Sequence, residues 1–419
     1  MAAAHESAGP GKGLLGWIDR RFPLSVLWRS QVSEYYAPKN FNFWYYFGSL
    51  ALFILVNQLV TGIFLTMSYK PSAAEAFSSI EYIMRDVSWG WLIRYMHSTG
   101  ASAFFIVIYL HMFRALLYGS HRKPRELLWI FGCLLFLVLM AEGFMGYVLP
   151  WGNMSFWGAQ VITSLFGSIP VIGGGLVDWI RGDYVIADAT LNRFFALHVA
   201  ALPLALIFLV IAHLMALHEV GSNNPDGIEI HDHNDAQGRP LDGIPFHPYY
   251  TVKDLVGVMG FLVLFGAVIF FAPTLGGLFL ESPNFAPANP LQTPPHIAPV
   301  WYFTPFYAML RAVPSFWGTQ VWGVLVMGAS ILVLFFVPWL DRSPVASVRY
   351  RGPIYKVMLA IFVVAFVILA ICGLKPPAGI YPELAKVCTV LYFAFFLLMP
   401  WYTRIDRVKP VPERVTGHE

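Results

Sequence analysis

Long apolar runs separated by short polar segments make up most of this 419-residue chain. Eight of these runs have about the length that a helix needs to cross a bilayer. They cover residues 44–67, 91–117, 129–149, 194–217, 255–272, 319–340, 356–374 and 385–401. The segments after Pro150 and Pro273 mix Pro and Gly with aromatic residues, which predicts interfacial helices and loops. The pattern therefore predicts an all-α membrane protein with about eight transmembrane helices.

Composition supports this class. Hydrophobic residues are 57% of the chain and charged residues 12%, and the mean hydropathy is +0.61, values far from those of a soluble protein. Cys133, Cys372 and Cys388 all lie in apolar runs without CxxC spacing. This argues against an iron–sulfur cluster or a thiolate metal site in the chain and predicts buried structural thiols.

Basic residues predict the orientation. With eight spans both termini lie on one side of the membrane, and that side receives Lys12, Arg20, Arg21, Arg29, Lys39, Arg122, Lys123, Arg125, Arg342, Arg349, Arg351, Arg404, Arg407, Lys409 and Arg414. The opposite side receives Lys70, Arg85, Arg181, Arg311 and Lys375. By the positive-inside rule the termini are cytoplasmic. The first residues lack a signal or transit pattern, so we expect no cleaved presequence and a bacterial inner membrane location.

Four histidines within the spans carry the candidate chemistry. His97 and His111 are 14 residues apart in one span, and His198 and His213 are 15 apart in another. At about 100° per residue, both members of a pair return to within roughly 60° of one face, and they lie roughly 21 to 22 Å apart along the helix. No single metal ion can reach both.

One of these histidines alone would be interpreted as an ordinary core residue. Four in register at bilayer depth favour a functional site, because ionisable groups are costly there. Neutral imidazole is an axial ligand of haem iron, so one histidine from each helix per haem predicts two bis-histidine haems. Iron with both axial positions filled is suited to carrying electrons rather than binding oxygen.

Glycines show the same period. Gly48 and Gly62 in the first span, and Gly132 and Gly146 in the third, are each 14 residues apart. Glycine inside a helix is destabilising unless something approaches the backbone closely, and a porphyrin edge is such a group. Packing of small residues between helices is the alternative. We interpret the shared period as a four-helix bundle of the first four spans around both haems.

Two arginines lie near the expected haem edges. Arg94 is three residues before His97, and Arg114 is three residues after His111. A guanidinium in either place suits a haem propionate. Snorkelling at the end of a span would explain the same positions.

Four stretches resemble a known family. They are GYVLPWGNMSFWGAQVIT at 146–163, LHEVGSNNPDG at 217–227, PFHPYYTVKD at 245–254 and PPHIAPVWYF at 294–303. Together, and in this order, they closely resemble the cytochrome b family, the haem-carrying subunit of quinol–cytochrome c oxidoreductase, or respiratory complex III. The resemblance runs from about Phe41 to beyond Trp339.

The resemblance implies a mechanism. Members of the family oxidise quinol at an outer site and reduce quinone at an inner site, sending one electron to an iron–sulfur partner and the other through two b-type haems, in the proton-motive Q cycle. By this match His97 and His198 hold the low-potential haem near the outer face. His111 and His213 hold the high-potential haem near the inner face. Ser49, Gln58 and Trp129 complete the expected haem-contacting set.

The resemblance also implies the quinone sites and the partners. The outer site maps to Phe144, Tyr147, Gly158, Ile162, Pro295, Trp301, Tyr302 and Tyr307. The inner site maps to His218, Ser222 and Asp254, with Lys253 beside it. Without the family match, His218 could equally cap its helix, and Asp254 could be the N-cap of the span near Leu255. The expected partners are a Rieske iron–sulfur subunit, a c-type cytochrome, ubiquinone, the lipid bilayer and a second copy of the complex, with no nucleic acid.

Two positions depart from the family pattern. Most of the family has a glutamate, thought to take a proton from quinol, at the position of Val300. Glu142, five residues before Tyr147, is an acid in an apolar run where the family usually has none. We therefore hypothesise that Glu142 replaces the missing proton acceptor. A carboxylate facing a loop or a water pocket, with no catalytic role, is the alternative.

The spacing of two histidines also departs from the family pattern. His213 follows His198 by 15 residues, where many respiratory members have 14. Plastoquinol-oxidising photosynthetic relatives share the longer step, but they usually split the protein after the fourth span. An extra residue rotates a ligand by about 100°, which predicts a local bulge or bend in this helix, near Pro203.

The expected organisation has five parts. These are a cytoplasmic N-terminal segment with an amphipathic helix at 1–43, the di-haem bundle with outer-site interfacial helices at 44–218, a cytoplasmic loop at 219–254, C-terminal transmembrane helices at 255–402 and a cytoplasmic tail at 403–419. The loop contains His231 and His233, which we assign to a solvated surface rather than a metal site.

Two other functions remain open from the residues. A di-haem anchor would pass electrons between a quinone pool and another dehydrogenase or hydrogenase, although the PVWY and GYVLPWG segments weigh against it. A transporter would use the histidines as a proton relay and would be colourless.

Overall fold

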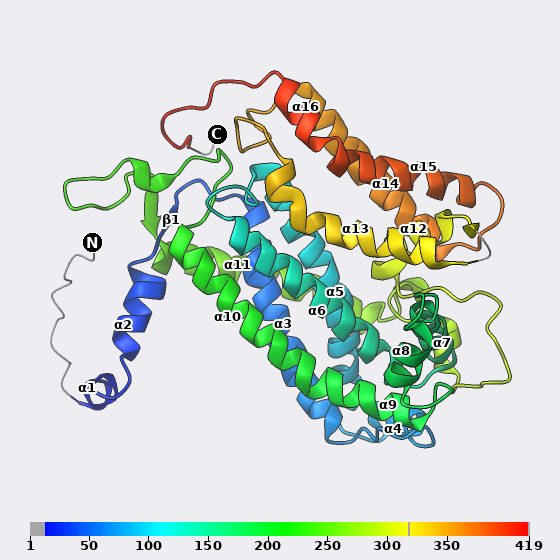
Figure 1. Cartoon of the computed structure of the whole chain (residues 1–419). Helices are drawn as coiled ribbons and strands as arrows, with labels where there is room; N and C mark the ends of the chain where they lie inside the picture. Colours follow the sequence, from blue (N-terminus) through cyan, green and yellow to red (C-terminus); the bar gives the residue numbers. More distant parts are fainter. Residues whose placement is uncertain (1–12, 317–318, 418–419) are drawn as a thin grey trace.

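The computed structural model describes residues 13–316 and 319–417, and shows an almost entirely helical protein (Figure 1). Lys12 and the start of the expected N-terminal segment lie outside the described residues. Among the described residues, seven helical spans are long and apolar enough to cross a membrane. They are η2–α3 (Phe43–Thr66), α5 (Gly90–Tyr118), α6 (Glu126–Val148), α9–η3–α10 (Asp188–Val220), α11 (Phe246–Phe271), α13 (Val321–Leu340) and α14 (Pro353–Leu374).

The eighth crossing is a bent pair of helices, α15 (Tyr381–Leu397) and α16 (Met399–Ile405), which meet at 61°. The two ends of the described chain lie at the same end of the molecule: Asp242, in the loop before α11, pairs with Lys39 at 2.9 Å and with Arg414 at 2.6 Å. Ends on one side require an even number of crossings, so the bent pair counts as one. The expected all-α fold with about eight spans is confirmed.

The remaining elements are short and lie at the ends of the spans. They are α1 (Leu14–Asp19), α2 (Leu24–Trp28), η1 (Arg29–Ser33), β1 (Tyr36–Pro38), α4 (Ala76–Arg85), α7 (Asn153–Phe166), α8 (Gly173–Arg181), η4 (Ile230–Asp232), β2 (Gly243–Pro245), η5 (Leu275–Gly277), η6 (Ser282–Phe285), η7 (Trp301–Phe303) and α12 (Thr304–Ala312). Antiparallel pairing of β1 with β2, with Tyr36 opposite Pro245, ties the N-terminal segment to the loop before α11.

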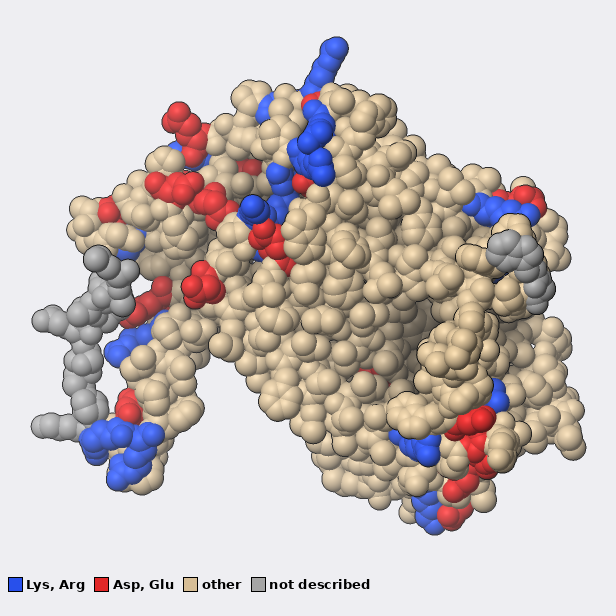
Figure 2. Space-filling model, in the orientation of Figure 1, with Lys and Arg blue, Asp and Glu red and all other residues tan. Residues whose placement is uncertain are grey.

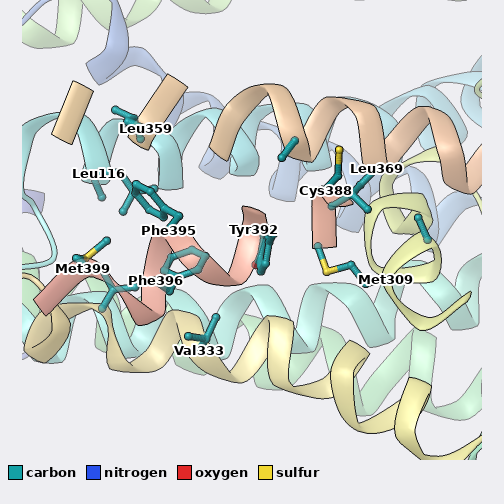
Figure 3. Close-up of a cluster of buried hydrophobic side chains, with 14 of the residues drawn as sticks. Leu116, Met309, Val333, Leu359, Leu369, Cys388, Tyr392, Phe395, Phe396 and Met399 are labelled. Atoms are coloured by element: carbon teal, nitrogen blue, oxygen red, sulfur yellow. The ribbon is translucent and has the colours of Figure 1, made fainter. Parts of the chain in front are cut away.

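The first four spans pack as two close pairs, α3 with α5 and α6 with α10, and these pairs lie side by side (Figure 1). Helix α11 covers α3 and α5, and α13 packs against α6. The C-terminal helices form their own layer. Figure 3 shows Tyr392, Phe395 and Phe396 of α15 meeting Leu359 of α14 and Val333 of α13 in one buried apolar cluster. All three cysteines are buried and unpaired, as expected.

Two spans begin six or more residues before the apolar pattern predicted. Helix α11 starts at Phe246 rather than Leu255, with a kink at His247, and the fourth span starts at Asp188 rather than 194. Both added segments contain charged and polar residues, so the apolar signal is weak there although the helix continues. The alternative that Asp254 is an N-cap is therefore wrong, because it lies within the helix.

The predicted bulge in the fourth span is confirmed. The segment η3 (Leu197–Ala201), which contains His198, is a π-helical turn in which the Leu202 N–H donates to the Leu197 carbonyl five residues back. Pro203 follows at the start of α10 and has no N–H to continue the usual pattern. The wider turn takes up the extra residue between His198 and His213.

Charged side chains gather toward the ends of the molecule, and the face in Figure 2 shows an almost uncharged band between them. At the end that holds the termini, Asp341 is fully buried after α13 and accepts from Arg351 at 2.5 Å and from His121 at 2.9 Å. Burial raises the pKa of Asp341, but the charge of Arg351 and the His121 hydrogen bond outweigh it and hold this pKa well below its usual range.

Asp341→Asn should destabilise the protein by about 3–5 kcal/mol, because it leaves the Arg351 guanidinium, 1% exposed, without a counter-charge. Thermal unfolding of the purified protein in detergent would measure this. Asp235→Asn, which weakens an exposed pair with Arg239, is the matched control and should leave the unfolding temperature nearly unchanged. Equal effects of the two substitutions would contradict a structural role for the buried pair.

Candidate functional site

The four histidines form two facing pairs between α5 and the fourth span. The ring centroids of His97 and His198 are 6.2 Å apart with an interplanar angle of 84°. Those of His111 and His213 are 6.4 Å apart at 60°. The two pairs lie roughly 21 Å apart along α5. Each pair is therefore a separate site at its own depth.

Hydrogen bonds orient the outer pair. The Thr61 hydroxyl donates to the Asn57 carbonyl at 2.6 Å, so it accepts from Nδ1 of His97 at 2.9 Å. Nδ1 of His198 donates to the backbone carbonyl of Glu142 at 3.0 Å. With Nδ1 protonated in both rings, the neutral imidazole keeps a free electron pair on Nε2, which is the form that binds a metal.

Each of the four periodic glycines faces one of the four histidines. A Cβ at Gly48 would lie 3.4 Å from Cε1 of His111, one at Gly62 3.3 Å from His97, and one at Gly132 3.5 Å from His213. At Gly146 a Cβ would overlap the ring of His198. The glycine period is therefore matched to the histidine period. The glycines of α3 face the histidines of α5, and the glycines of α6 face those of the fourth span.

The other residues expected beside the histidines are Gln58, Arg94, Arg114 and Trp129. Gln58 donates from its amide to the His97 carbonyl at 3.0 Å, which holds α3 to α5 beside the outer pair. Arg94 makes no ion pair within the described chain, and Arg114 lies over the Tyr45 ring at 4.6 Å. Trp129 instead donates its indole N–H to the Leu334 carbonyl of α13 at 2.7 Å and packs in the C-terminal cluster.

A cavity of about 920 Å³ joins the inner histidine pair to the predicted inner quinone residues. Its lining includes His111, His213, Gly48, Ser49, Gly132, Arg114, His218, Ser222, Lys253 and Asp254. The sequence expectation that His218, Ser222 and Asp254 share one site agrees with this geometry.

Residues of the N-terminal segment also line this cavity, and sequence reasoning did not find them. The Tyr35 hydroxyl is 2.8 Å from the Ser222 hydroxyl, and its ring centroid is 4.6 Å from that of His218. Gln31 offers its carbonyl to Nε2 of His218 at 3.2 Å. The β1–β2 pairing helps to bring this segment to the cavity, and three-residue strands leave no clear signal in the sequence.

The expected outer quinone residues come from α6, α7, η7 and α12. Tyr302 stacks on Phe105 at 3.8 Å, and Trp301 donates its indole N–H to the Ser102 hydroxyl at 3.1 Å. Phe144 packs against Phe194.

The other expected outer residues lie as follows. Gly158 faces the Tyr147 ring, and the Arg311 guanidinium lies over the Tyr307 ring, 4.6 Å from its centroid. Ile162 lies one turn after Gly158 on α7, and Pro295 is exposed in the loop before η7.

The acid beside Tyr147 is not Glu142. The Tyr147 hydroxyl donates to Oε2 of Glu281 at 3.3 Å, and Glu281 lies in the loop between η5 and η6. Burial raises the pKa of Glu281 to about 7. Glu142 instead points its Oε1 at Nδ1 of His198, at 3.1 Å. The one signal in the sequence is that Glu281 is an acid in the same connection between α11 and α12 as Val300, but the sequence alone does not place it beside Tyr147.

The loop histidines have no partner set for a metal. Within residues 13–316 and 319–417 no three His, Cys, Asp or Glu side chains are grouped closely enough to hold an ion. This does not bear on haem, which takes only two protein ligands per iron.

Comparisons with known proteins agree with one another. Family models described as "Cytochrome b/b6/petB" and "Cytochrome b(C-terminal)/b6/petD" match residues 32–221 and 287–393. The chain is 66% identical to cytochrome b of Allochromatium vinosum, over 96% of this chain and 98% of that protein. It is 46% identical to cytochrome b/c1 of Bradyrhizobium diazoefficiens, over 97% of this chain and 57% of that one.

A chain in a solved structure of hyperthermophilic respiratory complex III is similar in fold, with a TM-score of 0.85 and 40% sequence identity. The match covers 94% of this chain and 99% of that chain. Two family models over most of the length, close relatives along nearly all of it and a shared eight-span fold lead to one conclusion: the chain belongs to the cytochrome b family and is the membrane-spanning subunit of an oxidoreductase.

Proposed function

We propose that this chain is the haem-carrying, quinone-binding subunit of a quinol–cytochrome c oxidoreductase. It oxidises quinol at an outer site, reduces quinone at an inner site and so contributes to a proton-motive force by the Q cycle. The observation that carries the proposal is the pair of facing histidine sites at two depths in one bundle.

The residues present fit two haems. Two metal–imidazole bonds of about 2 Å on opposite sides of one ion would set the ring centres about 6 Å apart. The observed separations are 6.2 and 6.4 Å. His97 with His198 and His111 with His213 would be the ligands, and Arg94 and Arg114 the propionate partners. Bound haems would supply one-electron carriers between the two quinone sites.

The inner site is the cavity beside His111 and His213. His218, Ser222 and Asp254 can donate to or accept from the two ring oxygens of a quinone, and Lys253 adds a cation. Tyr35 holds the Ser222 hydroxyl in place and covers one face of His218. We therefore add Tyr35 to the inner site.

The outer site has Glu281 as its proton acceptor in this proposal. A general base works best when its pKa is near the operating pH, and Glu281 meets this condition at about 7. The Tyr147 hydroxyl holds the carboxylate, and Trp301 and Tyr302 form aromatic walls for a quinol ring. Glu142 is the weaker candidate, because its carboxylate faces His198.

The expected assembly follows from the family and from charge. The chain spans 57% of the relative named cytochrome b/c1. We propose a c-type cytochrome and a Rieske subunit as partners, and a homodimer of the complex. Basic residues at the end that holds both termini support a bacterial inner membrane with cytoplasmic termini.

Potentiometric titration of haem b absorbance in the purified complex tests the function. We expect two components of different potential, together with quinol-dependent cytochrome c reduction that stops with an outer-site inhibitor. His213→Leu should remove one component, and His233→Leu, on the exposed loop, should remove neither. A colourless protein would support a transporter, and two haems without reduction of cytochrome c would support a di-haem anchor.

Gly146→Ala should remove the outer haem, because the new methyl group overlaps the His198 ring. Gly48→Ala should keep both haems, since its contact with His111 at 3.4 Å needs only a small adjustment. Gly260→Ala, with no neighbour within 4 Å, is the control. Haem content per chain, from the pyridine haemochrome spectrum, measures the outcome, and a Gly146→Ala protein with both haems would refute the close fit.

Glu281→Gln should lower the rate of quinol oxidation by about 10²–10⁴-fold. Below the pKa of about 7 Glu281 is protonated and cannot accept a proton, so the wild-type rate should rise as the pH increases through 7. The variant should lose this step. Glu383→Gln, at an exposed pair with Lys386, is the control. A step that survives in Glu281→Gln but disappears in Glu142→Gln would return the role to Glu142.

A further inference from the structure

Glu142 makes a contact that the quinone sites do not explain. Its Oε1 lies 3.1 Å from Nδ1 of His198, the same nitrogen that donates to the Glu142 backbone carbonyl at 3.0 Å. The side chain is 16% exposed, and its Oε2 has no hydrogen-bond partner within the described chain. One residue therefore presents both its carbonyl and its carboxylate to one imidazole N–H.

The other three histidines lack such a partner. Nδ1 of His97 meets the Thr61 hydroxyl, a neutral acceptor. No side-chain acceptor faces Nδ1 of His111 or of His213 among the described residues. The contact is thus specific to one of the four rings.

Helix α6 repeats the same backbone arrangement at the outer and the inner histidine, so the two positions can be compared directly. Glu142 lies four residues before Gly146, and Leu128 lies four residues before Gly132 on the same helix. The backbone of Leu128 faces His213 as that of Glu142 faces His198. The two positions differ in the side chain, which is apolar at the inner site and a carboxylate at the outer one.

We propose that Glu142 is a positioning residue for His198 and lowers the reduction potential of the outer haem. This rests on the proposed function, since His198 must be an axial ligand. A carboxylate that accepts from the far N–H of a metal-bound imidazole fixes the ring orientation and increases the electron donation of Nε2. Stronger donation stabilises the oxidised, more positive iron.

The position of His198 explains why such a contact is useful. It lies in the π-helical turn, where the helix is wider and backbone hydrogen bonding does not follow the regular pattern. The Glu142 carboxylate, as a second acceptor for Nδ1, restrains the orientation of the His198 ring within this irregular turn. Its ring stands at 84° to that of His97, against 60° in the inner pair.

Glu142→Gln tests the inference in the purified complex. It keeps the size and an oxygen acceptor but removes the carboxylate. In a potentiometric titration the equilibrium between the reduced and the oxidised outer haem should shift about tenfold toward the reduced form. This corresponds to a rise of about 59 mV in its reduction potential, for a one-electron couple. The inner component should not move. The low-spin electron paramagnetic resonance signal of the outer haem should shift with it.

Glu126→Gln is the matched control, because it removes an acid from the same helix roughly 24 Å away along the axis and should leave the outer haem unchanged. An unchanged outer potential and resonance signal in Glu142→Gln, with both haems bound, would overturn the inference. Fewer than two haem components in the wild-type protein would instead refute the proposed function.

If Glu142→Gln loses the outer haem, Glu142→Asp distinguishes an effect of the carboxylate from an effect of packing. The aspartate keeps a carboxylate, so it should retain the outer haem at a potential closer to that of the wild type. If both variants lose the haem alike, the role of Glu142 is packing, and the inference fails.

Discussion

Two helices must present their histidines at the same two depths, and the rest of the bundle depends on this constraint. An imidazole on α5 can face one on the fourth span twice only if both helices advance equally between their two histidines. The fourth span has one residue too many, and its π-helical turn absorbs the excess. The glycines of α3 and α6 follow the same spacing because each lies against one of the rings.

Features that depend on local periodicity could be predicted from the sequence. The spans, the histidine pairs, the glycine match and the irregular turn before Pro203 all follow from counting residues along a helix. Helix boundaries were less accurate where polar residues continue a helix beyond the hydrocarbon, as at the start of α11. There the hydrogen bonds of the helix persist although the apolar signal has ended.

Contacts between distant segments could not be predicted in this way. Nothing local to Glu281 indicates that it meets Tyr147, and nothing local to Tyr35 indicates that it meets Ser222. The family motifs predicted the residues of two quinone sites, but they pointed to Val300 and away from Glu281. Glu142 was recognised as unusual from its apolar surroundings, but only the packing of α6 against the fourth span shows that His198 is its neighbour.

The junction at the end that holds the termini sets an order of assembly. All four histidines have been synthesised by residue 213, and domains generally fold from the N-terminus as the chain emerges. Asp242 and Asp226, in contrast, bind Arg414 and Thr416 of the C-terminal segment. The bundle that would hold the haems can thus form early in biosynthesis, whereas the polar junction next to the inner cavity is completed only once residues 414–416 have been synthesised.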